Sequence, residues 1–384
     1  AVYWIFGFLR MGTVGLTAQA LGRDDKPEVS ALLTRGLIVG AGAGLLLIVL
    51  QAPIFWAAFL VSPASTEVEG LARTYMEIRI WSAPAAIALY AITGWLIAQE
   101  RTRAVLILQL WMNGVNILLD LWFVLGLDWG VAGVAWATFI AEISGAALGL
   151  WFCRQVFATP AWRDWAQVFD AAWLKVMAIV NADILIRSLL LQAIFVSFVF
   201  LSATFGDDAL AANQVLLQFV YITAFALDGF AHAAEALVGQ AFGARQRAAL
   251  RRSAALATIW GGATCVFVSA VYLGTGPAIV DLMTTSASVQ DVARGYLVYV
   301  VVMPVLGVWA FMLDGIFIGA TRTRDMRNMM AVSFVVYLLA LVALVPLLGN
   351  HGLWLALLLS FVARGATLGL RYPALERASV APRA

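Results

Sequence analysis

Eleven apolar stretches, each close to the roughly 20 residues that a helix needs to cross a bilayer, dominate this 384-residue sequence. Hydrophobic residues make up 63% of the chain and charged residues 12%, against about 45–50% and about 25% in soluble domains. A water-soluble fold of this size cannot bury that much apolar surface. Free backbone groups are not tolerated in lipid and no strand-like alternation is visible. We therefore predict an all-α integral membrane protein with spans at Ala1–Leu21, Leu37–Leu60, Ile80–Ala98, Ala104–Leu125, Val131–Cys153, Val176–Leu201, Leu210–Val238, Ala254–Tyr272, Tyr296–Ile318, Met329–Leu348 and Leu353–Leu370.

Basic residues are concentrated in alternate connections between these stretches. Eighteen of the 24 Lys and Arg residues lie there, whereas the other connections hold only Arg73, Arg79 and Arg294. The side of the membrane that is richer in Lys and Arg is cytoplasmic. We predict a multi-pass protein of the inner (plasma) membrane, with a cytoplasmic C-terminus and residue 1 outside. The eighteen are Arg23, Lys26, Arg35, Arg101, Arg103, Arg154, Arg163, Lys175, Arg245, Arg247, Arg251, Arg252, Arg322, Arg324, Arg327, Arg371, Arg377 and Arg383.

The sequence lacks the residues and motifs that several classes of function require. A net charge of +2 gives no basis for nucleic-acid binding, and Cys153 and Cys265 have neither a disulfide framework nor metal-ligand spacing. With His232 and His351 as the only histidines, a His-based metal site and a Ser-His triad are not expected. No P-loop, HExxH or GxSxG motif occurs. We predict that the protein is not an enzyme, has no cofactor, and draws its energy from an ion gradient.

An internal repeat divides the chain into two similar halves. Four short segments recur in the same order at offsets of 219 to 221 residues. Tandem copies of this kind, with the same orientation in the membrane, are known in transporters, where the substrate path lies between them. Residue 1 aligns with about residue 222, so we expect the first helix of a twelve-helix protein to be absent from this sequence. The paired segments are Thr17–Gly22 with Val238–Gly243, Arg101–Arg103 with Arg322–Arg324, Pro84 with Pro304, and Gly133–Ala137 with Gly352–Ala356.

The repeat also sets the expected domain boundaries. We predict a first lobe at 1–153, a cytoplasmic linker at 154–175, a second lobe at 176–371 and a cytoplasmic tail at 372–384. Trp162 and Trp165 lie in the basic linker, where they suit an amphipathic segment on the membrane surface.

Motifs along the whole chain carry a family resemblance: Phe8–Thr13 with Thr17–Gly22, Asn181–Asp183 with Ile186–Gln192, Leu227–Ala231 with Glu235, and Leu313–Arg322. They resemble the multidrug and toxic compound extrusion (MATE) transporters, and more specifically the DinF-like subfamily. The resemblance implies two six-helix lobes, of which 11 of 12 helices are present here, and cation-coupled export by alternating access. It further implies that the missing helix is the family's first, which normally carries an aspartate central to coupling, so the key site is incomplete.

Three polar residues form the leading candidate site. Asn116 and Asp120 are spaced i, i+4 on one helix, and Thr138 lies at a similar depth on the next helix of a tight hairpin. Hard cations prefer such oxygen ligands, and a buried carboxylate can instead take up a proton. The resemblance matches Asn116, Asp120 and Thr138 to the first-lobe cation or proton site. The only metal ion expected there is Na⁺. We expect Asp120 to be largely buried and without an Arg or Lys partner; in the alternative, Asp120 only hydrogen-bonds neighbouring helices.

Other ionisable residues at membrane depth are candidates because burial makes them costly. Glu142 and Arg10 lie at similar depth, and we favour a structural ion pair between them over substrate contact. Asp228, on the same helical face as Glu235, is the second lobe's candidate for contact with a cation or substrate.

Five charged residues of the second lobe form a candidate network. Asp183 and Arg187 are spaced i, i+4 and are expected to neutralise each other. Glu235, Asp314 and Arg364 all lie within about two turns of the cytoplasmic surface. The five together either form a charged seal that opens and closes, or serve as scaffolding.

The leading functional hypothesis is a secondary antiporter that exports amphipathic, cationic compounds in exchange for H⁺ or Na⁺. Its partners would be small molecules and the lipid bilayer, not nucleic acid, and we expect a monomer. A flippase or exporter of a lipid-linked precursor is the alternative, although few Lys or Arg residues lie within the spans to form a basic cavity. A membrane-embedded enzyme is a weaker hypothesis, because no catalytic motif is present. A channel is weaker too, because polar residues concentrated in one lobe and an even repeat suit exchange better.

Overall fold

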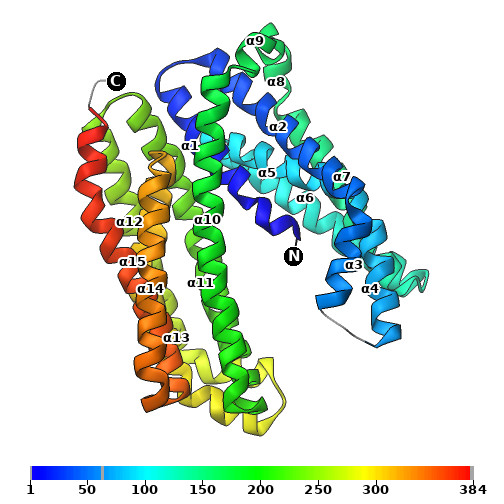
Figure 1. Ribbon diagram of the computed structural model, residues 1–384, viewed down its shortest axis with the longest axis vertical. Helices are drawn as coiled ribbons and strands as arrows, with labels where there is room; N and C mark the ends of the chain where they lie inside the picture. The colour runs from blue at the N-terminus through cyan, green and yellow to red at the C-terminus, as the bar shows by residue number, and fades with distance from the viewer. Residues whose placement is uncertain (1, 62–64, 381–384) are drawn as a thin grey trace. The chain divides into compact units, whose positions relative to one another are not determined.

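The computed structural model describes residues 2–61 and 65–380, and within these ranges the regular elements are all helices (Figure 1). Residue 1 and residues 381–384, including Arg383 of the expected tail, lie outside the described part. The chain divides into two compact units, Ala1–Met177 and Ala178–Ala384, which we call the first and the second unit. The expected linker therefore belongs with the first unit.

The first unit contains η1 (Val2–Phe6), α1 (Gly7–Gly22), α2 (Lys26–Val49), α3 (Gln51–Val61), α4 (Thr66–Arg79), η2 (Ile80–Ser82), α5 (Ala83–Ala98), α6 (Thr102–Asp120), η3 (Leu121–Gly126), α7 (Gly130–Phe152), α8 (Arg154–Phe157), η4 (Pro160–Arg163) and α9 (Trp165–Val168). Helix α5 is central to it, because α1 and α2 both pack along α5. Helices α6 and α7 form the hairpin expected for the candidate site, and α4 also packs on α7.

The second unit contains η5 (Ala203–Phe205), α11 (Asp207–Gly243), α12 (Arg247–Met283), α13 (Ala287–Gly319), α14 (Thr323–Leu348) and α15 (Asn350–Ala378). Helix α10 (Ala171–Ser202) begins in the first unit and continues into the second. Helix α13 packs against α11, α12 and α15, and α14 packs along α15. Large buried side chains fill this unit, among them Phe198, Phe219, Tyr337 and Trp354.

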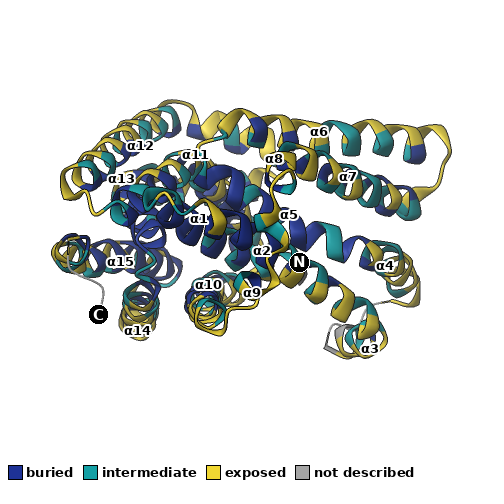
Figure 2. Ribbon diagram, turned by 90° about the horizontal axis from the view of Figure 1, so that it is seen from above, coloured by how far each residue is buried: buried dark blue, intermediate teal, exposed yellow. Residues whose placement is uncertain are grey.

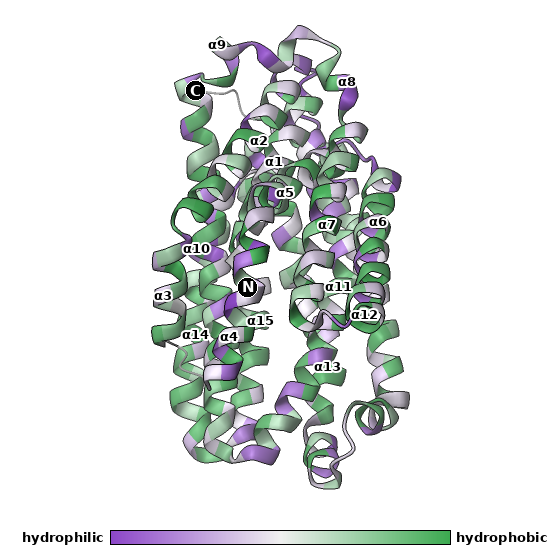
Figure 3. Cartoon of the chain, turned by 90° about the vertical axis from the view of Figure 1, so that its right-hand side faces the viewer, coloured by the Kyte–Doolittle hydropathy of each residue, from purple (hydrophilic) through white to green (hydrophobic). Residues whose placement is uncertain are grey.

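Ten described helices are long and apolar enough to cross a membrane. The expected span at Ala1–Leu21 corresponds to η1 and the 16-residue α1. Many large apolar side chains point outward; Leu282, Leu347 and Leu370 are 88%, 79% and 82% exposed. Figure 2 shows exposed residues along the outer faces of the helices, and Figure 3 shows hydrophobic residues over most of their length. Lipid is the medium that accommodates such surfaces, so the prediction of an all-α membrane protein is confirmed.

The expected span at Leu37–Leu60 has the wrong boundaries. Helix α2 begins earlier, because the Asp25 side chain caps it by accepting a hydrogen bond from the Glu28 amide (3.2 Å), with Pro27 in its first turn. It ends at Val49, and α3 starts after Leu50. Pro53 has no N–H to donate to the Val49 carbonyl four residues earlier, which breaks the helix at this point.

The internal repeat appears in the backbone of both units. Asp24 and Glu100 adopt left-handed conformations (φ 56° and 57°), and so do Arg245 and Thr321, the residues 221 positions later (φ 57° and 50°). Close helix contacts recur as well. A Cβ at Gly94 would lie 2.5 Å from a carbonyl oxygen of α1. A Cβ at Gly315, 221 residues later, would lie 2.7 Å from a carbonyl oxygen of α11. The two units thus use the same turns and the same glycine-mediated packing.

A buried arginine of α2 binds the segment after α7, together with Thr34, whose hydroxyl donates to the Trp162 carbonyl (2.9 Å). Arg35 donates from Nε to the Val168 carbonyl (2.8 Å) and from Nη2 to the Gln167 carbonyl (2.6 Å). It also contacts both carboxylate oxygens of Glu28, at 2.5 and 3.4 Å. The side chains of Arg35 and Glu28 are each only 1% exposed. We call Arg35, Glu28, Gln167 and Val168 the Arg35 clamp; the segment that Arg35 binds consists of the short helices α8, η4 and α9.

Candidate functional site

The α6–α7 hairpin brings two of the three predicted site residues into contact. Asn116 donates from its amide nitrogen to the Thr138 hydroxyl oxygen (3.2 Å), and Thr138 donates to the Val134 carbonyl (2.9 Å). No donor among the described residues bonds the amide oxygen of Asn116, so this oxygen is available as a ligand.

Asp120 is the last residue of α6, one turn beyond Asn116. Its side chain is half-buried, less than the prediction of a largely buried carboxylate requires. Oδ1 is itself buried and has no hydrogen-bond partner among the described residues, and no Lys or Arg in that part of the chain forms an ion pair with Asp120. The carboxylate hydrogen-bonds neither Asn116 nor Thr138 directly. The carboxylate can therefore still accept a proton or bind a cation.

A π-helical turn follows Asp120 directly. It covers Leu121–Gly126, with Phe123 buried. Single π-helical turns within helices are rare and occur frequently at functional sites, because they change the direction in which neighbouring side chains point. No pattern in the sequence predicts this turn.

Glu142 has a different partner from the one predicted. Arg79 binds its carboxylate through two nitrogens, Nη1 to Oε2 at 2.5 Å and Nη2 to Oε1 at 2.9 Å. The sequence pattern places Arg79 in an outer connection, but α4 runs through η2 into α5 as one spanning stretch, Thr66–Ala98. This continuity brings Arg79 to the depth of Glu142. Arg10 lies on α1, and the predicted Arg10–Glu142 pair is replaced by the bidentate Arg79–Glu142 pair.

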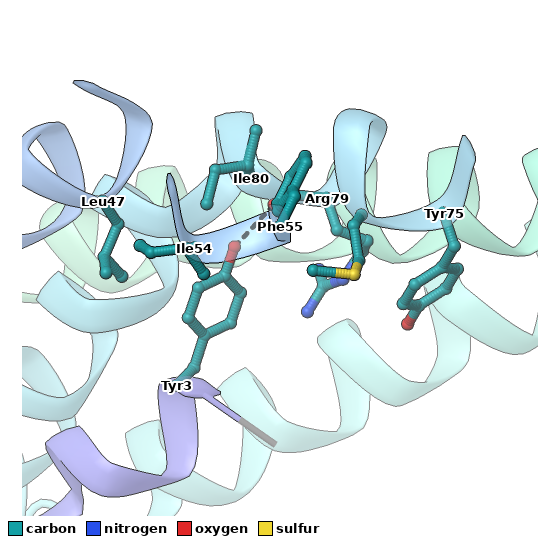
Figure 4. A pocket seen from close by; sticks show the side chains of 8 residues that line it. Tyr3, Leu47, Ile54, Phe55, Tyr75, Arg79 and Ile80 are labelled. Atoms are coloured by element: carbon teal, nitrogen blue, oxygen red, sulfur yellow. Dashed lines mark hydrogen bonds between the residues drawn. The ribbon is translucent and has the colours of Figure 1, made fainter. Parts of the chain in front are cut away.

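A pocket of about 140 Å³ lies beside Arg79 in the first unit (Figure 4). The Tyr3 hydroxyl donates to the Arg79 carbonyl (2.7 Å), and the Arg79 guanidinium lies 5.3 Å from the Tyr3 ring centroid. Aromatic and aliphatic side chains form the remaining walls. The lining residues are Tyr3, Leu47, Ile54, Phe55, Tyr75, Met76, Arg79 and Ile80.

In the second unit, Asp183 and Arg187 do not neutralise each other as predicted. Asp183 accepts from Arg327 (2.6 Å) and from the Thr323 hydroxyl (3.1 Å), both on α14. Arg187 instead donates to Asp314 of α13. Partners on neighbouring helices replace the i, i+4 contact, and Arg327 and Thr323 could not be found without knowing which helices are adjacent.

Three of the five predicted network residues do form one cluster. Arg187 and Arg364 both face the Oδ2 oxygen of Asp314, with Arg364 Nη2 at 3.8 Å. Glu235 is buried on α11 and Asp228 is half-buried on the same helix. The proximity of Arg187, Asp314 and Arg364 agrees with the prediction, while a sealing role for them stays a prediction.

The helical fold and the ionisable residues buried in its spans are those of a polytopic membrane protein. The MatE family model matches residues 1–122 and 184–343, so this chain belongs to the MATE family. DNA damage-inducible protein F of Escherichia coli K12 is 40% identical over 370 residues, 96% of this chain and 80% of the relative. A probable multidrug resistance protein NorM of Rhizobium meliloti is 27% identical over 250 residues, 63% of this chain and 53% of that protein.

Solved structures show the same fold. A MATE crystal structure in the bent conformation superposes with a TM-score of 0.87 at 18% identity, covering 98% of this chain and 86% of that chain. The Vibrio cholerae MATE transporter VcmN in its bent form gives 0.84 at 19% identity, with coverage of 98% and 86%. The predicted MATE fold and the resemblance to DinF-like members are therefore confirmed.

Proposed function

We propose that this protein is a secondary antiporter that exports amphipathic, cationic compounds in exchange for H⁺ or Na⁺. Membership of the MATE family supports the proposal, as do relatives named as multidrug resistance proteins. The observation that carries it is Asp120, whose buried Oδ1 lacks a partner among the described residues, one turn from the contact between Asn116 and Thr138.

In this proposal the α6–α7 hairpin holds the coupling ion. Asp120 supplies a carboxylate, Asn116 an amide oxygen and Thr138 a hydroxyl, a donor set that suits Na⁺, while protonation of Asp120 alone serves for H⁺. Ion binding and compound binding oppose each other, which is the thermodynamic requirement for exchange. The protein acts as a monomer, is not an enzyme and needs no cofactor besides the coupling ion. It resides in the inner membrane with its C-terminus in the cytoplasm, in accordance with the distribution of basic residues.

The test replaces Asp120 with Asn in the full-length protein, reconstituted in proteoliposomes. Export of a fluorescent cation is measured under an imposed pH gradient and, separately, under an imposed Na⁺ gradient. We expect Asp120→Asn to bind the compound but to export it no faster than passive leak. Asp128→Asn is the matched control, because Asp128 is exposed in the loop of the same hairpin, and it should export at the wild-type rate.

Export by Asp120→Asn at the wild-type rate, with equal incorporation into the vesicles, would contradict the proposal. Asp120 would then be structural, and Asp228 would be the next candidate for coupling. The gradient that drives wild-type export identifies the ion.

A further inference from the structure

The second unit contains a buried arginine whose hydrogen-bonding capacity is unused. Arg364 of α15 is 2% exposed, and its guanidinium makes no hydrogen bond to any described residue. Its Nε is completely buried without a partner, and the nearest carboxylate oxygen is 3.8 Å away, beyond hydrogen-bond distance. A guanidinium carries five N–H donors, and burying a charge without hydrogen bonds is costly. Arg364 therefore requires an acceptor that the described residues do not supply.

The charge of the cluster also calls for an anion. Asp314, 5% exposed, is already hydrogen-bonded by Arg187, whose own Nε is buried without a partner. Asp183 does not contribute, because Arg327 neutralises it. Two guanidinium groups thus share one carboxylate, which leaves the cluster of Arg187, Asp314 and Arg364 with a formal charge of +1. One anionic group would balance this charge and accept from Arg364.

The surroundings of Arg364 select for an amphipathic ligand. Its guanidinium carbon lies 5.4 Å from the Phe311 ring centroid and 5.3 Å from that of Phe361. These two rings stack on each other, with centroids 5.8 Å apart. Phe311 packs against two apolar clusters of the second unit. A small hydrated anion gains no binding free energy from contact with these aromatic rings. An anion with an aromatic or aliphatic body gains binding free energy because it buries apolar surface against them.

We propose that Arg364, assisted by Arg187, binds the carboxylate of an amphipathic anion, with the apolar body of the ligand against Phe311 and Phe361. Asp314 Oδ1 is buried without a partner as well, so a hydroxyl or ammonium group near the ligand's carboxylate would fill this acceptor. The site belongs to the second unit, whereas Asn116, Asp120 and Thr138 belong to the first. It extends the range of ligands beyond the cationic compounds of the proposed function.

The test measures equilibrium binding to the full-length protein in phosphatidylcholine nanodiscs by isothermal titration calorimetry. The probes are 4-phenylbutyrate and, with the same body and opposite charge, 4-phenylbutyltrimethylammonium. Acetate and inorganic phosphate represent the anionic group alone. We expect saturable binding of 4-phenylbutyrate that weakens at least tenfold in Arg364→Gln and is partly restored in Arg364→Lys. Arg371→Gln is the matched control, because Arg371 is exposed two turns further along α15.

Several results would overturn the proposal. They are the absence of saturable 4-phenylbutyrate binding to the wild type, unchanged binding in Arg364→Gln, equal weakening of both probes, and acetate or phosphate binding as tightly as 4-phenylbutyrate. Thermal unfolding of the wild type with and without 4-phenylbutyrate provides a measurement independent of any variant, since a ligand of the folded state raises the midpoint. Export of the cation in the Asp120 experiment is a separate readout, so failure of one proposal is distinguishable from failure of the other.

Discussion

Replacing Arg35 with Met should loosen the segment after α7, which then keeps the hydrogen bond from Thr34 to the Trp162 carbonyl (2.9 Å). The substitution keeps the apolar stem of the side chain but removes the donors to the Val168 and Gln167 carbonyls and to Glu28. Glu28 remains buried, with a hydrogen bond from the Gln167 side chain (3.2 Å). Removing one partner of a buried ion pair costs about 3–5 kcal/mol, because the other charge is left uncompensated.

Hydrogen exchange measured by mass spectrometry on peptides covering residues 160–170 checks this prediction. Every 1.4 kcal/mol corresponds to a tenfold change, so exchange limited by local opening should accelerate by roughly two to three and a half powers of ten. Adding Glu28→Gln to Arg35→Met removes the buried charge and should recover part of the protection. The same peptides are compared in Arg73→Met, which breaks an exposed pair with Glu69 at 3.5 Å and should cost at most about 1 kcal/mol.

Unchanged exchange in Arg35→Met would refute the reasoning, since the segment would then be held by other contacts. Equal acceleration in Arg35→Met and Arg73→Met would refute it too. In that case burial of the ion pair would not determine its contribution.

Two further substitutions test packing and charge in the second unit. Gly315→Ala places a Cβ 2.7 Å from the Ala231 carbonyl oxygen and should lower the midpoint of thermal unfolding. Gly262→Ala, in open space on α12, should stabilise the helix by about 0.5–1 kcal/mol and so raise the midpoint slightly. Equal midpoints of the two variants would contradict this. Arg327→Met removes the guanidinium that Asp183 binds at 2.6 Å and should destabilise the unit by about 1.5–3 kcal/mol in thermal unfolding. A further Asp183→Asn change should recover part of the loss, and no recovery would show that the charge of Asp183 is immaterial.

The elements that follow from local pattern were predictable from the sequence. Apolar length located the spanning helices but not the bounds of Leu37–Leu60, and the loop between Leu125 and Val131 predicted the hairpin that brings Asn116 to Thr138. Recurring segments gave the duplication, because the same local residues produce the same turns and contacts.

What depends on the neighbours of a helix was not predictable. Glu142 pairs with Arg79 because α4 continues into α5 and packs on α7. Asp183 pairs with Arg327 because α14 presents a guanidinium at that depth. Charge spacing along one helix identifies the nearest partner in sequence. A buried charged group, however, is stabilised most by the partner that completes its hydrogen bonds, and this partner can lie on another helix. The π-helical turn after Asp120 has no compositional signal at all.

The turns that contain a residue in the left-handed conformation, here called corners, have a practical consequence for labelling. Asp24 and Arg245 occupy equivalent corners with opposite charges, and Glu100 and Thr321 differ in both charge and size. The backbone conformation at these corners therefore does not depend on one residue type; the helices on either side impose it. A spectroscopic label introduced by a cysteine at Glu100 or at Thr321 should leave the chain path intact. The protein thus offers equivalent reporter positions in both units, and motion within one unit can be compared directly with motion within the other.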